Sequence, residues 1–329
     1  MGKKITYTEI AKETGISIST ISRVVKGNVP VKEVTRQKVL KALNNYGYFI
    51  DLQAESEESN LILVSLPSLN NPFYSKIIDG IESSASRFGM QVLLHAGSIN
   101  QRTIKSFLNL IESTNATGLI TLNYVEKPLL RMLSNTLPMV QCCEMNAEMD
   151  LPFVTINDIA AAKKAVNHLA SRNNKRIALI NGPHEYKYSH DRLIGYKEAL
   201  QENNLEFEEQ LVIQLPDINF DMALSASMQL LTSPTPPDAF FTVSDIFAAA
   251  VIRAASKCDL KIPDDIEVIG FDNIDISIMS TPSITTINQP KFQLGLQSCE
   301  TLCRIITGTA GKISQIYVDT ELVTRESTS

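Results

Sequence analysis

The chain has 329 residues, 44% of them hydrophobic and 20% charged, which is enough material for two or three domains with buried cores. No run approaches the roughly 18 apolar residues of a membrane span, and polar residues follow Ile5, so we expect neither a span nor a secretory signal. The five cysteines are too scattered for a disulfide framework, and Cys299 with Cys303 would need further ligands to hold a metal. We therefore expect a cytoplasmic protein that binds no membrane, metal or cofactor.

Charge is unevenly distributed along the chain. Residues 1–50 hold nine Lys or Arg and three Glu, a net +6, whereas the whole chain is −6, so the remainder carries −12. A basic head on an acidic body predicts that the head alone binds a polyanion.

The first predicted elements are two short helices joined by a glycine turn. Thr6 and Glu9 have the spacing of a capping box at the start of the first helix. Gly15 allows the backbone to turn, and Ser17 is expected to cap a second helix that runs to about Val25.

The second helix is amphipathic, and a third is predicted over about residues 32–46. Ile21 and Val24 are expected to face inward, as is Val34 on the third helix. Short hydroxyl side chains allow close approach to a DNA major groove, and Arg can make paired hydrogen bonds to guanine. A small helical bundle with a solvated face fits the same spacing, so spacing alone leaves both interpretations open. The outward residues of the second helix are Ile18, Ser19, Thr20, Ser22 and Arg23.

The string "YTEIAKETGISISTISRVVKGN", followed by "VTRQKVLKALNNYGY", favours DNA binding. It resembles the N-terminal helix-turn-helix of the lactose/galactose repressor (LacI/GalR) family, which implies that the head binds operator DNA. The resemblance places Ile18, Ser19 and Arg23 at base-reading positions, and Tyr7 at a position that serves either bases or phosphates. The remaining DNA-binding positions, most of them phosphate contacts, are Thr8, Ser17, Thr20, Ser22, Asn28, Thr35 and Arg36.

The segment "FIDLQAESEESN" departs from that family. Most relatives fold a hinge helix here and wedge a leucine into the minor groove, which bends the duplex. Residues 51–58 instead hold four acids and no Lys or Arg, and phosphates would repel them. We expect a flexible linker that lets the two heads of a dimer accept variable half-site spacing, with Leu52 as a remaining wedge as the alternative.

From Leu61 onward, short apolar runs alternate with amphipathic helices. "LILVSL", "MQVLLH", "GLITL" and "PMVQCC" read as strands, and the pattern restarts with "RIALI", "AFFTV" and "EVIGF". This alternation of strands and helices predicts parallel sheets with crossover helices. Because the alternation occurs in two successive series, it predicts two lobes with a cleft at the carboxyl ends of the strands. The predicted helices cover about residues 73–88, 101–114 and 127–135, with two more that begin at Asp158 and about Asp191.

The body also resembles the LacI/GalR family, in strings such as "NNPFYSKIIDGIE", "KIPDDIEVIGFDN" and "PSITTINQPKFQLG". The implied fold class is an all-α helix-turn-helix head and an α/β bilobed, periplasmic-binding-protein-like body with two doubly wound parallel sheets, which forms a homodimer. The predicted division is a head over 1–50, a linker over 51–60 and a body over 61–329. Lobe 1 takes about 61–157 and 289–318, and lobe 2 takes about 158–288 and 319–329.

Six residues are the candidate effector ligands. Asn71, Phe73 and Tyr74 follow the first strand, where an aromatic ring can stack on a base or sugar, although Phe73 could simply pack at its helix start. By resemblance, Arg192, at the end of the loop "HEYKYSHDR", donates to the effector. Asp272 accepts from its hydroxyls. The sixth candidate is Asp245 in "VSDIF", which either contacts the effector or caps its helix.

The effector is predicted from strings that resemble the cytidine-repressor subgroup of the family, "EMNAEMDLPFV", "HDRLIGY" and "IGFDNIDIS". Most sugar-responsive relatives have Asp-Arg where this chain has Cys143-Glu144. We therefore expect a nucleoside such as cytidine, with a sugar or a purine as the alternative, and leave open cooperation with a co-bound activator protein. An enzyme is disfavoured because no P-loop, nucleophile elbow or catalytic histidine grouping occurs. A periplasmic binding protein is disfavoured by the DNA-binding head.

Overall fold

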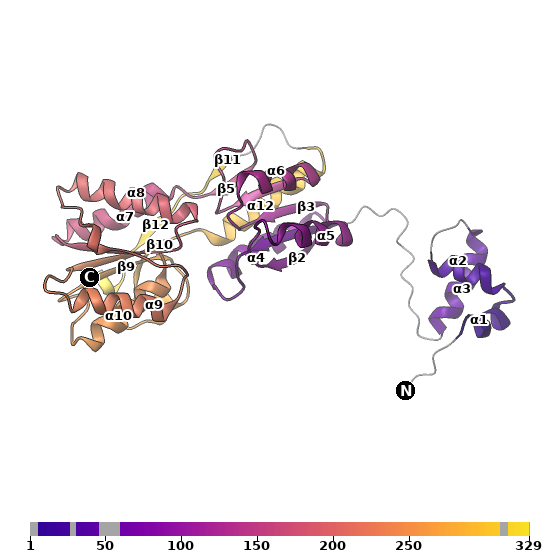
Figure 1. The fold of residues 1–329 in the computed structure, drawn as a ribbon, viewed down its shortest axis with the longest axis horizontal. Coiled ribbons are helices and arrows are strands. Elements are labelled where there is room, and N and C mark those ends of the chain that lie inside the picture. The colour runs from indigo at the N-terminus through magenta and orange to yellow at the C-terminus, as the bar shows by residue number, and fades with distance from the viewer. Residues whose placement is uncertain (1–5, 27–30, 46–59, 310–314, 329) are drawn as a thin grey trace. The chain divides into compact units, whose positions relative to one another are not determined.

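The computed structural model describes residues 6–26, 31–45, 60–309 and 315–328 (Figure 1). They form two compact units, one within residues 1–58 and the other within residues 59–329. Asn28 and residues 51–59 of the predicted linker lie outside the described residues.

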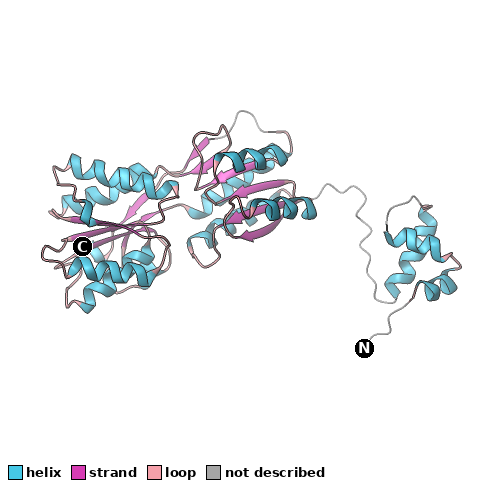
Figure 2. Ribbon diagram, viewed as in Figure 1, coloured by secondary structure: helices cyan, strands magenta, loops and turns pink. Residues whose placement is uncertain are grey.

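The first unit contains three helices, α1 (Tyr7–Thr14), α2 (Ile18–Lys26) and α3 (Glu33–Asn45) (Figure 2). The capping box is present, because the Thr6 amide donates to Glu9 Oε2 at 2.8 Å. Gly15 ends α1 with φ +69°, a left-handed conformation that glycine adopts without strain. Ser17 Oγ accepts the Thr20 amide at 3.2 Å, which confirms the predicted cap of α2.

Ile21 and Val24 are buried in the head as predicted, but the prediction for Val34 is wrong. Its side chain is 73% exposed. The inward stripe of α3 contains Val39 and Leu43, and the residue one turn before Val39 on that stripe is position 35 or 36, not 34. The head core consists of Ile10, Ile21, Val24, Val39, Ala42 and Leu43.

The second unit contains two six-stranded sheets, each in its own lobe (Figures 1 and 2). In lobe 1 the strand order is β11-β5-β4-β3-β1-β2 and every pairing is parallel. Its strands are β1 (Leu61–Leu66), β2 (Gln91–Ala96), β3 (Gly118–Thr121), β4 (Met139–Cys142), β5 (Phe153–Thr155) and β11 (Gln315–Tyr317). Its helices are α4 (Phe73–Arg87), α5 (Ile104–Thr114), α6 (Lys127–Thr136) and α12 (Lys291–Ile306).

In lobe 2 the order is β12-β10-β9-β8-β6-β7, and β12 alone among these runs antiparallel to its neighbour. Helices α7 and α8 cover one face of the sheet, and α9 and α10 cover the other (Figure 1). Its strands are β6 (Ile177–Asn181), β7 (Val212–Gln214), β8 (Ala239–Thr242), β9 (Glu267–Asp272), β10 (Thr285–Asn288) and β12 (Glu321–Val323). Its helices are α7 (Asp158–Ser171), α8 (Lys187–Glu202), α9 (Phe220–Leu231), α10 (Asp245–Lys257) and α11 (Ile276–Met279).

Strand β1 shows why the strands are continuous apolar runs. Leu63 belongs to the cluster formed with α5 and α6, whereas Ile62 and Val64 belong to the cluster that contains α4 and α12. Successive side chains point to opposite faces, so a sheet covered on both sides needs apolar residues at every position.

Helices α4 and α12 of lobe 1 approach each other closely. A Cβ atom on Gly80 would overlap the Phe292 carbonyl, and one on Gly295 would overlap the Ile77 carbonyl. Glycine at these two positions therefore lets the helix backbones meet.

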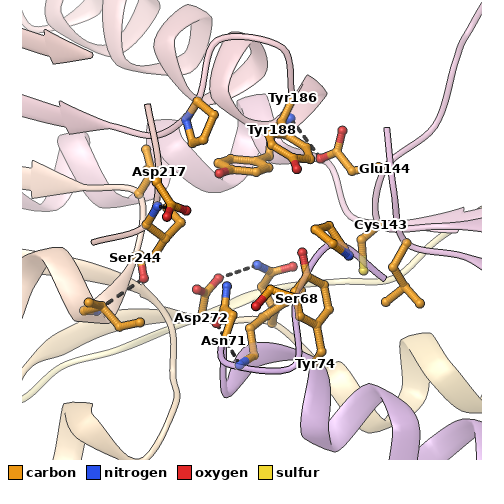
Figure 3. A pocket seen from close by; sticks show the side chains of 18 of the residues that line it. Ser68, Asn71, Tyr74, Cys143, Glu144, Tyr186, Tyr188, Asp217, Ser244 and Asp272 are labelled. Atoms are coloured by element: carbon orange, nitrogen blue, oxygen red, sulfur yellow. Dashed lines mark hydrogen bonds between the residues drawn. The ribbon is translucent and has the colours of Figure 1, made fainter. Parts of the chain in front are cut away.

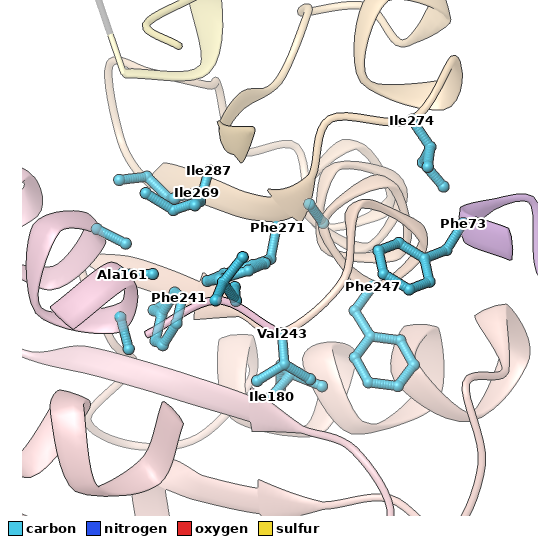
Figure 4. Close-up of a cluster of buried hydrophobic side chains, with 14 of the residues drawn as sticks. Phe73, Ala161, Ile180, Phe241, Val243, Phe247, Ile269, Phe271, Ile274 and Ile287 are labelled. Carbon is cyan, nitrogen blue, oxygen red and sulfur yellow. The ribbon is translucent and has the colours of Figure 1, made fainter. Parts of the chain in front are cut away.

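The chain passes between the lobes three times. It crosses from β5 to α7, from β10 to α12, and from β11 to β12. A buried apolar cluster spans the lobes as well, because Phe73 of α4 belongs to the same cluster as Phe247 and Ile274 of lobe 2 (Figure 4).

Candidate functional site: an inter-lobe cavity and a helix-turn-helix surface

A cavity of about 380 Å³ lies between the lobes (Figure 3). Its wall is built from segments that follow the carboxyl ends of strands in both sheets, where ligands bind in open α/β folds. Five of the six candidate effector residues line it, namely Asn71, Phe73, Tyr74, Arg192 and Asp272.

Arg192 is held at the centre of a buried network. Its Nε donates to Asp158 Oδ1 at 2.9 Å and its NH1 donates to the Val243 carbonyl at 2.8 Å. The guanidinium carbon lies 3.5 Å from the centroid of the Phe271 ring, so stacking also fixes its plane. These contacts leave part of the guanidinium edge for a ligand. The prediction that Arg192 ends a loop is wrong, because Arg192 lies in the second turn of α8.

Asp272 lies 4.0 Å from Arg192, measured from Oδ1 to NH1, and its Oδ1 accepts from Gln289 Nε2 at 2.6 Å. Burial raises its pKa to about 6, against the opposing effect of the Arg192 and Lys291 charges. Its φ of +101° is unusual for a residue with a side chain. Lys291 Nζ donates to the carbonyls of Asp272 and Asn273, which holds this turn in place.

Asp245 does not line the cavity, although its neighbours Ser244 and Ile246 do. Its carboxylate accepts from Thr286 Oγ1 at 2.6 Å and from the Ile274 amide at 2.8 Å, so it ties α10 to strand β10 and to the turn after β9. It does not cap the helix either, because Ser244 Oγ accepts the Ile246 amide. Burial, followed by the Asp272 charge, raises the pKa of Asp245 to about 8.

The aromatic residues have two different environments. Phe73 is 8% exposed and packs in the buried cluster that spans the lobes, although it also lines the cavity. Tyr74 makes an edge-to-face contact with Phe73, with the ring centroids 5.3 Å apart. Tyr186 and Tyr188 stack on each other from lobe 2, with centroids 5.5 Å apart (Figure 3). Asn71 accepts the Phe73 amide at 3.0 Å and so fixes the start of α4.

Glu144 is a wall residue that sequence reasoning did not place among the ligands. It follows β4 in lobe 1, and its carboxylate accepts the amides of Lys187 and Tyr188 at the start of α8 in lobe 2. This explains why the predicted start of α8 near Asp191 is four residues too late. The capping acceptor comes from another lobe, so no local signal marks the first turn.

Further wall residues were also missed, among them Asp158, Tyr186, Tyr188, Asp217 and Gln289. Asp158, Asp217 and Gln289 lie within three residues of the carboxyl ends of β5, β7 and β10, and because these strands were not predicted, the rule that ligands bind at strand ends gave no signal for them. Tyr186 and Tyr188 follow β6, which was predicted, but they lie five and seven residues beyond its end, at the start of α8.

In the head, most of the predicted DNA-binding residues lie on the surface. Tyr7, Thr8, Ser17, Ile18, Ser19 and Arg23 are exposed, and Thr20, Ser22, Thr35 and Arg36 are half-buried. Ile18 is 48% exposed, so its side chain is accessible on the outer surface of α2.

The described residues contain no grouping of three or more His, Cys, Asp or Glu that could hold a metal ion. None of their helices combines the length and apolarity that a bilayer crossing demands.

Comparison with known proteins agrees with this architecture. Residues 6–50 match the family model for bacterial regulatory proteins of the lacI family, and residues 166–328 match that for a periplasmic binding protein-like domain. The HTH-type transcriptional repressor CytR of Escherichia coli (strain K12) is 34% identical over 329 residues, or 98% of this chain and 96% of CytR.

Solved structures extend the comparison. The complex of the transcriptional regulator CelR with cellobiose has a TM-score of 0.77 and 27% identity, over 98% of this chain and 100% of that chain. The lac repressor dimer bound to operator and the anti-inducer ONPF has a TM-score of 0.77 over 99% of this chain and 100% of that chain. At 24% identity, this second likeness shows the fold alone.

These matches confirm the predicted fold class. A regulator of this family acts by binding DNA in the cytoplasm and is not an enzyme, in agreement with both predictions. The chain belongs to the LacI family of DNA-binding transcriptional repressors, with a helix-turn-helix head and an effector-binding body.

Proposed function

We propose that a nucleoside such as cytidine binds in the inter-lobe cavity and modulates how this repressor engages its operator. One observation carries the proposal. The cavity wall combines a hydrogen-bonding group, Arg192, Asp272 and Gln289, with a group of tyrosines, Tyr74, Tyr186 and Tyr188. A nucleoside carries both matching parts, vicinal ribose hydroxyls and a planar base.

In this arrangement Asp272 accepts from the ribose hydroxyls and Arg192 donates to their oxygens. The base faces Tyr74, and Phe73 supports that ring from the buried side. The similarity to CytR along nearly the whole chain supports this assignment.

A sugar is the second candidate, and the CelR structure favours it because that regulator holds cellobiose. The hydroxyl-binding group would serve a sugar equally well, whereas the paired Tyr186 and Tyr188 rings favour a flat base.

The proposed mechanism is a population shift in a homodimer. The effector closes the cleft, changes the angle between the lobes and thereby changes how the two heads contact DNA. Coupling of this kind is typically about 1–3 kcal/mol. The proposed parts are the head over 1–50, the linker over 51–60 and the two-lobed body over 61–329. On DNA, Ile18, Ser19 and Arg23 read bases, and the other predicted head residues, Asn28 included, contact mainly phosphates.

A thermal-shift screen of the full chain tests the effector. We expect cytidine to raise Tm more than uridine, adenosine, hypoxanthine, ribose, galactose or cellobiose, because a ligand that binds only the folded state stabilises it. The Asp272→Asn protein should lose most of the cytidine response. A larger shift with cellobiose or galactose than with cytidine would favour the sugar and reject the nucleoside.

Operator binding is tested with duplexes that the full chain selects from a random pool. Arg23→Ala should weaken binding to the selected duplex about tenfold or more, since a paired contact to guanine contributes about 1–3 kcal/mol of discrimination. Lys175→Ala, an exposed position in lobe 2, is the matched control and should bind as the wild type does. Equal binding by both variants would remove Arg23 from the base-reading set.

A further inference from the structure

Glu144 bridges the two lobes at the edge of the cavity. Its Oε2 accepts the Lys187 amide at 2.8 Å, and its Oε1 lies 3.4 Å from the Tyr188 amide. The residue before α8, Tyr186, makes no side-chain capping bond. The first amides of a helix lack partners within the helix and carry a partial positive charge, so a carboxylate there is favourable. Lobe 1 thus supplies the cap for a lobe 2 helix.

Glu144 is 5% exposed, and its carboxylate forms no ion pair among the described residues. The ammonium of Lys187, whose amide Glu144 accepts, instead pairs with Asp158 at 2.9 Å and with Asp191 at 2.7 Å. Burial raises the pKa of Glu144 to about 7, although the amide and the charge of Lys187 oppose this effect. The titratable groups that face Glu144 are Tyr74 on α4, Cys143 after β4, Asp158 on α7, Tyr186 before α8, and Lys187 and Tyr188 on α8.

We propose that Glu144 is a positioning residue that fastens α8 to lobe 1 when the cleft is closed, and that its carboxyl takes up a proton from solvent as the cleft closes on the effector. The inference rests on the proposed function in one respect, namely that the effector binds the closed cleft. Glu144 acts through α8, which carries Tyr188 and Arg192 of the cavity wall.

The direction of the pH effect follows from the two environments. In an open cleft the carboxyl faces water and has an ordinary pKa of about 4.3. In the closed structure its pKa is about 7. Between these values closure takes up a proton, so closure and effector affinity become more favourable as the pH falls. Between pH 8 and pH 6 the expected gain in affinity is about tenfold.

Calorimetric titration with cytidine at pH 6, 7 and 8, in two buffers of different ionisation enthalpy, tests this. The wild type should bind about tenfold more tightly at pH 6 than at pH 8 and should take up protons on binding. Glu144→Gln keeps an oxygen acceptor for the amides but cannot ionise, so its affinity should change less with pH and exceed the wild-type value at pH 8. Glu144→Ala leaves the amides of α8 without the acceptor and should bind more weakly at every pH.

The carboxyl of Asp272 also titrates in this range and contributes to the pH dependence of both proteins. The contribution of Glu144 is therefore the difference in the pH dependence of cytidine affinity between the wild type and Glu144→Gln. Parallel pH profiles for these two proteins would overturn the inference. Absence of heat with every nucleoside would instead remove the proposed effector.

The same two proteins without effector test whether proton uptake belongs to closure. In the open cleft Glu144 faces water, so the Tm difference between the wild type and Glu144→Gln should stay nearly constant from about pH 5.5 to 8. A wild-type Tm that falls relative to Glu144→Gln as the pH rises would show that Glu144 is buried before the effector binds, and would overturn proton uptake on binding.

Discussion

At the scale of single residues, burial decides what each cavity side chain does. Arg192 and Asp272 are both buried, yet each has defined partners, so their charges are tolerated beside the cavity. Phe73 is also buried, and most of its ring contributes to the apolar cluster between the lobes. Its substitution is therefore expected to affect folding as well as binding.

Phe73→Ala should lower the free energy of unfolding by about 3–5 kcal/mol, because it removes a buried ring and leaves a cavity. Denaturant-induced unfolding measures this loss. Leu69→Ala, whose side chain is 61% exposed in the neighbouring loop, is the control and should change stability little. Stability of Phe73→Ala equal to that of the wild type would mean that the ring serves the ligand alone.

The candidate ligands were predictable from the sequence to different degrees. Asn71, Phe73 and Tyr74 follow a strand that is evident from its apolar run, and the structure places all three at the cavity. Asp245 has the same sequence signal but points away from the cavity to Thr286 and Ile274, contacts that no local pattern reveals. Glu144 was noted only as a departure from relatives, because its function depends on a helix 43 residues later in the chain.

At the scale of elements, the close crossing of α4 and α12 is the contact most sensitive to side-chain size. The two glycines lie opposite the backbone of the partner helix, so any side chain must push the helices apart.

Gly295→Ala should therefore destabilise the body by about 1–3 kcal/mol, despite the better helix propensity of alanine. Ser83→Ala on the exposed face of α4 is the matched control and should be neutral or slightly stabilising. Circular dichroism during thermal unfolding measures both. A higher Tm for Gly295→Ala than for the wild type would contradict the close packing of these helices.

Long periodic elements were predictable, and short or distantly capped ones were not. The helices α4, α6 and α7 begin within a residue of their predicted positions, because their apolar stripes are regular. Strands β5, β7 and β12 are three residues each, too short for an alternating pattern to be seen. Their positions are set by pairing with longer neighbours in each sheet.

At the scale of the whole molecule, the basic head and the acidic remainder of the chain differ in their attraction to DNA. The head carries a net +6 and the rest of the chain −12, so electrostatic attraction to DNA is confined to the head.

Operator affinity should therefore fall steeply with salt, with a slope of about −0.9 in log–log form for each phosphate contacted. Fluorescence anisotropy with a selected duplex measures this slope. A fragment of residues 59–329 should not bind the duplex at any salt concentration, since its acidic surface is repelled by phosphates. Salt-independent affinity of the full chain, or binding by the fragment, would contradict the division of roles.

Calorimetric titration of the full chain with cytidine tests most directly whether the inter-lobe cavity is a nucleoside site. We expect saturable heat with one cytidine per chain, binding at least tenfold tighter than ribose, and at least a tenfold loss in Asp272→Asn, which keeps the shape of the side chain but removes its charge. Heat that is absent, or that is unchanged in Asp272→Asn, would contradict a nucleoside held between the lobes.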